Sequence, residues 1–404
     1  MNQRRTPEKI ALSFLILMGV VSMFSDMTHE GAASIIGAYL SLAGASAAMI
    51  GFVTGLGGFI GYSLRIVTGI LADRTRSYWP ITIAGYIVDC AAIPALALIP
   101  NGGWQIACIL IVVQRIGKAV KKPAKDTLLS FAAARYGAGK GFAIQEVLDQ
   151  IGAFAGPIIL FFALLFQKGS DTFSGYRFCL AILGIPAFIT ILLLFYAKRK
   201  FSNPEKFEPK AETRDTAVRV SSAFWFYIVG ISLFAFGFLG FPLITMHVLK
   251  AGLLSETTLP LIYAGAMAVD AVAALIFGWL YDKYGLDILM LSTLLAAPFA
   301  LFVFFTQSAT MLYLGVALWG IGMGAQESIL KAAVVTIIPK EKRSTGYGIF
   351  QTFFGVAFFL GSWLAGYLYS VSIIGMIAVS CGMQLVAIPF FHQACRANRM
   401  KKLA

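Results

Sequence analysis

Three ionisable residues, Asp26, His29 and Glu30, lie close together inside a long apolar stretch. At about 100° per residue they fall within an arc of roughly 100° on a helix. Two carboxylates one turn apart repel each other when both are ionised, so the pair is suited to hold and release a proton. The imidazole of His29 can share that proton. We interpret the cluster as a site of proton coupling or substrate contact; the alternative is a static ion pair with Arg65 or Arg115.

A second cluster of charged residues lies within the stretch 104–130. At helical spacing, five of its side chains share an arc of roughly 100°: Arg115, Lys118, Lys122, Lys125 and Asp126. A helix with so many charges cannot face lipid, so it must line water or meet carboxylates. Glu146 and Asp149 in the next apolar stretch are expected to pair with Lys122 and Lys125. The cluster is therefore either an ion-pair lattice, which we favour, or an anion-attracting vestibule.

The composition indicates that these clusters belong to a membrane protein. Of 404 residues, 59% are hydrophobic and 13% are charged, whereas soluble domains average about 45–50% and about 25%. This composition excludes an ordinary soluble enzyme, a disordered regulator and a nucleic-acid-binding domain. The five cysteines show no paired spacing, and no nucleotide-binding or zinc-protease motif is present. We therefore expect no enzyme activity, no metal, no cofactor and no nucleic-acid partner.

Twelve apolar stretches are long enough to cross a bilayer, which takes about 20 residues. They predict an all-α polytopic membrane protein with helices at about 11–40, 46–70, 80–99, 104–130, 141–166, 177–198, 222–249, 257–281, 286–306, 309–338, 344–369 and 371–392. The long polar stretch 199–220 is expected to link an N-terminal six-helix half (1–198) to a C-terminal half (221–404). Lys and Arg gather in alternate loops, and this bias places both termini in the cytoplasm.

The two predicted halves repeat one another. Gly69-Ile-Leu-Ala-Asp73-Arg74 follows the second expected span, and Gly278-Trp-Leu-Tyr-Asp282-Lys283 follows the eighth. Three further pairs of glycines match at a separation of 205 positions: Gly117 with Gly322, Gly141 with Gly346, and Gly156 with Gly361. Such register-matched similarity indicates duplication of a six-helix unit.

With these loops, the whole chain resembles the major facilitator superfamily (MFS) of transporters. The resemblance implies that Asp73 and Arg74 form a cytoplasmic gate with Asp282 and Lys283 as their counterpart, and that the lattice of Lys122, Glu146 and Asp149 lies near that gate. Glycine at 69 and 278 is expected to let neighbouring helices approach closely.

The resemblance also implies roles inside the spans. Arg115 is similar to an arginine that the family places in its fourth span, and the run Gly152, Gly156 and Pro157 resembles a packing element of antiporters. Asp270 is expected to face the central cavity, whereas Asp89, in a peripheral span, is expected to have a structural partner. Glu327 is a further candidate, although Lys331, four residues on, can satisfy its charge.

We therefore predict a secondary transporter that works by alternating access. Proton-coupled export of a small organic molecule is preferred, with Asp26, Glu30 and His29 as proton carriers. Proton-coupled uptake or exchange of an organic anion is the alternative, and a non-transporting receptor or scaffold is a third possibility. The expected partners are a small-molecule substrate, protons and the lipid bilayer. We expect a functional monomer in a bacterial inner membrane.

Overall fold

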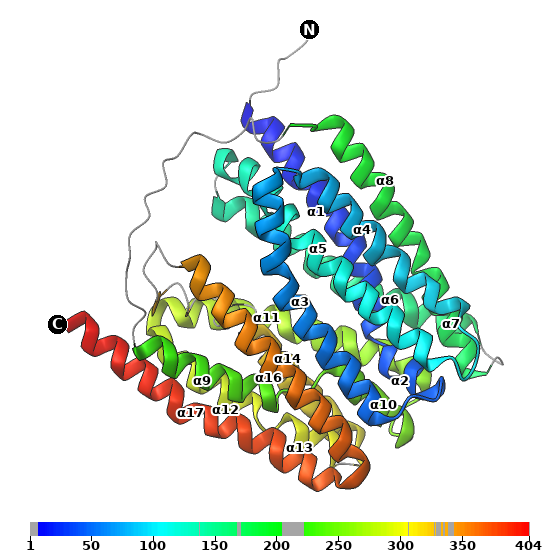
Figure 1. Cartoon of the computed structure of the whole chain (residues 1–404). Coiled ribbons are helices and arrows are strands. Elements are labelled where there is room, and N and C mark those ends of the chain that lie inside the picture. Colours follow the sequence, from blue (N-terminus) through cyan, green and yellow to red (C-terminus); the bar gives the residue numbers. More distant parts are fainter. Residues whose placement is uncertain are drawn as a thin grey trace. The chain divides into compact units, whose positions relative to one another are not determined.

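The computed structural model describes residues 7–136, 138–167, 171–203, 222–305, 307–326, 328, 333, 336–337 and 343–403. Helices supply the regular structure of these residues (Figure 1). Lipid offers no hydrogen-bond partner to a backbone amide, and a helix satisfies its own backbone internally. The apolar stretches predicted from the sequence accordingly appear as helices, interrupted at glycine, proline and short loops.

The first six predicted spans correspond to eight α-helices. Two of the spans, 11–40 and 177–198, are each built from two helices in succession. The helices are α1 (Pro7–Ala33), α2 (Ile36–Leu42), α3 (Ala47–Thr75), α4 (Tyr78–Ala95), α5 (Trp104–Tyr136), α6 (Ala138–Phe166), α7 (Thr172–Ile182) and α8 (Gly184–Lys200).

The last six predicted spans are also helical where the structure describes them. The helices are α9 (Ser222–Gly237), α10 (Phe241–Lys250), α11 (Leu259–Tyr284), α12 (Ile288–Ala296), α13 (Phe299–Phe304), α14 (Ala309–Ala325), α16 (Arg343–Val371) and α17 (Ile373–Leu403). Within the described chain, nine segments are long and apolar enough to cross a membrane, and one of them, Glu256–Phe304, covers two predicted spans. Helix α5 is not among them, because it carries the lysine-rich cluster.

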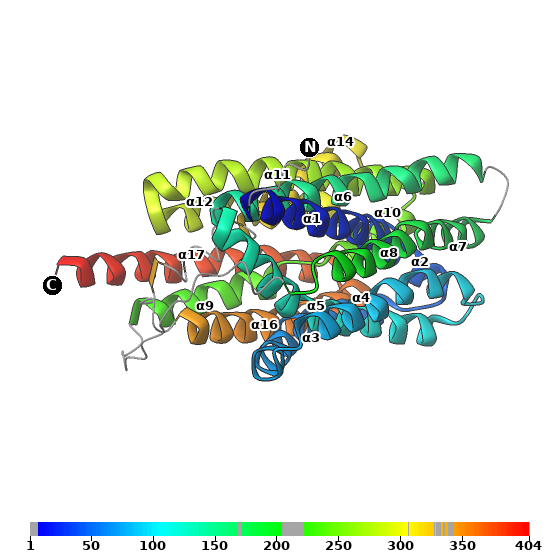
Figure 2. The same cartoon turned by 90° about the horizontal axis from the view of Figure 1, so that it is seen from above.

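The chain forms two compact packing units. The first comprises residues 1–33 and 64–213, in which α1 packs against α5, α6 and α8, and α4 packs against α5 and α8 (Figure 2). At one end of this unit, the rings of Phe14, Trp79 and Phe201 meet edge to face. The Trp79 indole donates a hydrogen bond to the Phe201 carbonyl oxygen over 3.1 Å, which ties the start of α4 to the end of α8.

The second packing unit comprises residues 34–63 and 214–404. Here α9 packs against α16 and α17, α11 against α14, and α2 against α10. An aromatic cluster surrounds Trp319, whose indole donates to the Leu239 carbonyl oxygen over 2.9 Å. Its ring contacts those of Phe238 and Phe241.

These packing units are not the halves predicted from the sequence, because the segment 34–63 packs with the second unit. The predicted halves are defined by an internal repeat, whereas the units are defined by contacts. The division of the chain at residues 199–220 therefore stays a prediction.

Candidate functional site

Helices α4 and α5 lie close enough for short polar side chains to meet between them. A methyl group added at Gly85 would lie 2.6 Å from the Lys121 backbone nitrogen, and one added at Gly117 would lie 2.6 Å from that of Asp89. Glycine at both positions is therefore what permits this approach. The two glycines place the carboxylate of Asp89 directly beside α5.

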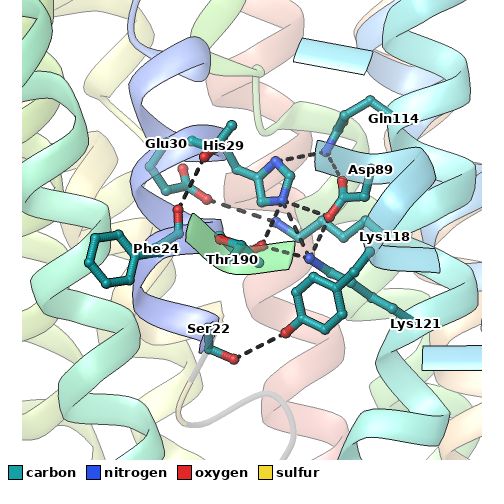
Figure 3. Close-up of polar contacts among 12 residues, drawn as sticks. Ser22, Phe24, His29, Glu30, Asp89, Gln114, Lys118, Lys121 and Thr190 are labelled. Atoms are coloured by element: carbon teal, nitrogen blue, oxygen red, sulfur yellow. Dashed lines mark hydrogen bonds and ion pairs between the residues drawn. The ribbon is translucent and has the colours of Figure 1, made fainter. Parts of the chain in front are cut away.

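Asp89 is the centre of a buried polar network in the first packing unit (Figure 3). His29 Nε2 of α1 lies 2.7 Å from Asp89 Oδ2, and Lys121 of α5 forms an ion pair with the same oxygen. Gln114 Nε2 donates to Asp89 Oδ1 over 2.8 Å. The Asp89 side chain is fully buried and that of His29 is 4% exposed. The prediction that Asp89 has a structural partner is confirmed.

Lys121 has further contacts that make its burial tolerable. Its Nζ donates to Ser25 Oγ over 2.7 Å and lies 4.0 Å from the centre of the Tyr86 ring. A buried ammonium is stable only when a counter-ion and hydrogen-bond acceptors surround it, and an aromatic face adds a further attraction. The network thus links three helices, α1, α4 and α5, through one carboxylate.

Asp26 and Glu30 are less enclosed than His29. Glu30 forms a 3.8 Å ion pair with Lys118, and both side chains are about a quarter exposed, at 22% and 27%. Asp26 is half-buried and interacts electrostatically with Asp149 on α6 and with Lys118 and Lys125 on α5. The predicted cluster therefore separates into one enclosed histidine and two more accessible carboxylates.

The lysines of α5 do not form the direct ion pairs expected with α6. Lys122 pairs with Asp126 on its own helix, 3.4 Å away. Lys125 is buried and donates to Ser22 Oγ over 2.8 Å, and Asp149 accepts a hydrogen bond from Gln145 over 2.6 Å. Asp149 still interacts electrostatically with Lys125 and Lys122. The expectation differs because α5 supplies its own nearer partner, Asp126, one turn away from Lys122.

The remaining candidates inside the spans lie elsewhere. Arg65 and Arg115 are half-buried in the first packing unit. Asp270 is buried on α11 in the second unit. Glu327, like its expected partner Lys331, lies outside the described residues. Their roles in proton coupling or substrate contact stay predictions.

The predicted gate residues lie at helix ends. Asp73, Arg74, Asp282 and Lys283 are all exposed. The Lys283 ammonium lies 5.6 Å from the ring centre of Trp279. Their pairing in a cytoplasmic gate stays a prediction, as does the place of Glu146, which is exposed and accepts a hydrogen bond from Gln150.

The expected close approach of helices at Gly69 and Gly278 stays a prediction. A methyl group at Gly69 would make only ordinary contact with Pro123 Cβ, at 3.6 Å. One at Gly278 would meet no atom of the described chain within 4 Å. Among the described residues, therefore, neither position shows the tight backbone contact seen at Gly85 and Gly117.

The glycines of α6, in contrast, do provide tight packing. A methyl group at Gly152 would overlap the Met23 carbonyl oxygen, and one at Gly156 would lie 2.9 Å from the backbone nitrogen of Gly31. Pro157 follows within the same helix. The element that resembles an antiporter motif therefore holds α1 and α6 in backbone contact.

The sequence reasoning missed the central role of Asp89, Gln114 and Lys121 in this network. Gln114 and Lys121 are seven residues apart, so they share a face of α5. Asp89 is an ionisable residue in an otherwise apolar span, which by itself marks a candidate site. Their meeting could have been suspected from these signals, but the neighbour relation of α1, α4 and α5 is a tertiary property.

Comparison with known proteins gives the family. The family model described as Major Facilitator Superfamily matches residues 15–254 and 241–395. An uncharacterized protein of Mycobacterium tuberculosis is 37% identical over 387 residues, covering 95% of this chain and 93% of that protein. An uncharacterized MFS-type transporter of Methanocaldococcus jannaschii is 24% identical and covers 88% of each chain.

Solved structures share the fold. A bacterial homologue of the human lysosomal transporter Spinster, inward-facing and unoccupied, matches with a TM-score of 0.67 at 15% identity, over 98% of this chain and 96% of that one. A D-xylose–proton symporter matches with a TM-score of 0.68 at 15% identity, over 95% and 96%. The predicted spans are helical where the structure describes them, and the family model covers most of the chain. The chain therefore belongs to the Major Facilitator Superfamily and is an integral membrane protein, a secondary transporter and not an enzyme.

Proposed function

We propose that the chain is a proton-coupled exporter of a small organic molecule, with Asp26 as its principal proton carrier. The observation that carries the proposal is the setting of Asp26. It is half-buried in the C-terminal third of α1 and has neither a hydrogen bond nor an ion pair with the part of the chain that the structure describes. A carboxylate inside a span without a fixed partner is energetically costly, so its presence marks a candidate functional site.

The charges around Asp26 support a role in proton exchange. Of the α5 lysines, Lys118 has Glu30, Lys121 has Asp89 and Lys122 has Asp126 as an ion-pair partner. Lys125 faces two carboxylates, Asp26 and Asp149, through longer-range interactions. One cation and two carboxylates carry a net charge of −1, and a single proton makes the group neutral. Buried groups favour neutrality, so this group is suited to bind one proton.

Export as the direction rests on the similarity of Gly152, Gly156 and Pro157 to an antiporter element. The second candidate, proton-coupled uptake or exchange of an organic anion, is favoured by the partly exposed Lys118 and the half-buried Arg115. The ion pairs of α5 argue against it, because most of its lysines already have carboxylate partners. We further propose that the protein acts as a monomer in a bacterial inner membrane with both termini in the cytoplasm, as the Lys/Arg bias of its loops favours.

A solute screen followed by a proton measurement tests the proposal. Purified protein is screened by thermal shift at two pH values against organic cations, neutral compounds and organic anions. Stabilising compounds are then added to proteoliposomes that contain a pH-sensitive dye. We expect cationic or neutral compounds to drive proton movement in the wild type, and Asp26→Asn to abolish it. Asp171→Asn, an exposed carboxylate outside the spans, serves as the matched control and should leave it intact.

Other outcomes would contradict the proposal. Full proton movement in Asp26→Asn would remove Asp26 as the carrier. Stabilisation by anions alone, lost in Lys118→Gln, would favour uptake or exchange. A protein that binds a solute but moves neither solute nor protons would support the receptor hypothesis.

A further inference from the structure

The side-chain amide of Gln114 lies between two groups with different hydrogen-bonding needs. Its Nε2 is 2.8 Å from Asp89 Oδ1 and 3.1 Å from His29 Nδ1 (Figure 3). An ionised carboxylate only accepts hydrogen bonds, so the amide group that faces Asp89 must be the NH₂. That NH₂ has a second hydrogen, and His29 Nδ1 is the other atom within its reach.

We propose that Gln114 is a positioning residue that fixes His29 as the neutral tautomer with its hydrogen on Nε2. An Nδ1 that accepts from Gln114 carries no hydrogen of its own. The hydrogen is then on Nε2, which lies 2.7 Å from Asp89 Oδ2 and 3.1 Å from Ser25 Oγ, its hydrogen-bond neighbour on the same helix. A hydrogen on His29 Nδ1 would instead face the hydrogen of Gln114 Nε2, so that two donors would oppose each other.

The charges that face His29 favour the same state. From α4 it meets the carboxylate of Asp89, and from α5 the ammonium groups of Lys121 and Lys118; Asp26 lies on its own helix. The Lys121 Nζ is only 3.4 Å from His29 Nε2, so an imidazolium would bring a second cation to that distance in an enclosed site. With His29 neutral, Asp89 and Lys121 balance each other and the network has no net charge.

The inference deepens the proposed function and rests on it in one respect. It removes His29 from the predicted proton carriers and leaves that task to Asp26, with Glu30 and Asp149 nearby. By holding His29 in one neutral state, Gln114, which does not titrate, excludes His29 from proton exchange.

Nitrogen NMR of the histidine rings tests the assignment directly. The chain has three histidines, so ¹⁵N-histidine-labelled protein gives few signals. Those of His29 are identified by their loss in His29→Gln and their retention in His392→Gln. We expect a pyridine-type Nδ1 and a pyrrole-type Nε2 signal that stay unchanged from about pH 5 to 8, the range in which a free histidine titrates.

Substitution of Gln114 tests its role as distinct from mere packing. Gln114→Glu replaces the donor with an acceptor, and we expect the His29 signals to change to those of an imidazolium with hydrogens on both nitrogens. Gln114→Met removes the donor at similar size, and we expect signals of both neutral tautomers. Wild-type signals of an imidazolium or of the Nδ1–H tautomer at neutral pH would overturn the proposal, as would wild-type signals in both Gln114 variants.

The two proposals fail in different measurements. An unexpected His29 spectrum would overturn the tautomer assignment and leave the proton movement that depends on Asp26 untouched. Proton movement that survives Asp26→Asn would overturn the proposed carrier and leave the His29 spectrum as it is.

Discussion

Replacing Asp89 with asparagine should strongly destabilise the protein, because it leaves Lys121 buried without its counter-ion. The Asp89 side chain is fully buried and that of Lys121 is 7% exposed, so water cannot compensate for the lost charge. Removing one partner of a buried ion pair costs about 3–5 kcal/mol. We expect a loss of that size in the free energy of unfolding of Asp89→Asn.

Equilibrium unfolding in mixed micelles with a rising fraction of SDS, followed by circular dichroism, measures the effect. Asp73→Asn is the matched control, because Asp73 is an exposed aspartate at a helix end and surface changes stay within about 0.5 kcal/mol. The double variant Asp89→Asn with Lys121→Met removes both charges and should be more stable than Asp89→Asn alone. The reasoning is refuted if Asp89→Asn unfolds like Asp73→Asn, or if the double variant loses the sum of the two single losses.

Three further predictions concern backbone packing and a helix cap. Gly117→Ala should cost about 1–3 kcal/mol in the unfolding assay, because the added methyl group meets the Asp89 backbone at 2.6 Å; unchanged stability would contradict the close approach of α4 and α5. Gly285 has φ +67° and ψ −141° at the end of α11, a conformation nearly restricted to glycine, so Gly285→Ala should cost about 1–3 kcal/mol, and a more stable variant would refute this. Hydrogen bonds from Ser174 at the start of α7 lower the pKa of Asp171. A lowered folded-state pKa adds stability above the unfolded-state pKa that is lost as the pH falls through the folded value, so Asp171→Ala should be less stable than wild type at neutral pH and equal to it in acid, as unfolding at a series of pH values would show.

The sequence alone predicts the fold well, because the membrane imposes strong constraints. Span length, apolarity and the repeat of Gly69–Arg74 at Gly278–Lys283 depend only on local sequence, and the twelve spans are helical where the structure describes them. Helix interruptions were not predicted: the first span breaks between Ala33 and Ile36, and the seventh breaks after Gly237. Such breaks depend on tertiary packing that supports a non-helical backbone inside a span.

The candidate site was predicted only in part, for a geometric reason. Periodicity on one helix places Asp26, His29 and Glu30 within a single arc, but it does not say which neighbour each edge of the arc meets. In the structure one edge, His29, faces Asp89 of α4, and the other, Glu30, faces Lys118 of α5. An arc of roughly 100° is wide enough to meet two different helices. Register between helices, set here by the contacts of Gly85 and Gly117, is not visible in any one segment.

The enclosed network around Asp89, which includes His29, is separate from Asp26. Substitutions in the network and at Asp26 should therefore have different effects, although His29 and Asp26 lie on the same helix. With His29 in its proposed neutral state, the network of His29, Asp89 and Lys121 has no net charge. The charges that then act on Asp26 are those of Asp149, Lys118 and Lys125. Under the proposed function, substitutions in the network should therefore lower stability, and the fraction that folds should still couple solute to protons. Substitution of Asp26 should do the reverse, because no ion pair among the described residues is lost with it. A folded Asp89 variant with wild-type stability but altered proton stoichiometry would show that the enclosed charges take part in coupling after all, and that the neutral tautomer of His29 is not its only functional state.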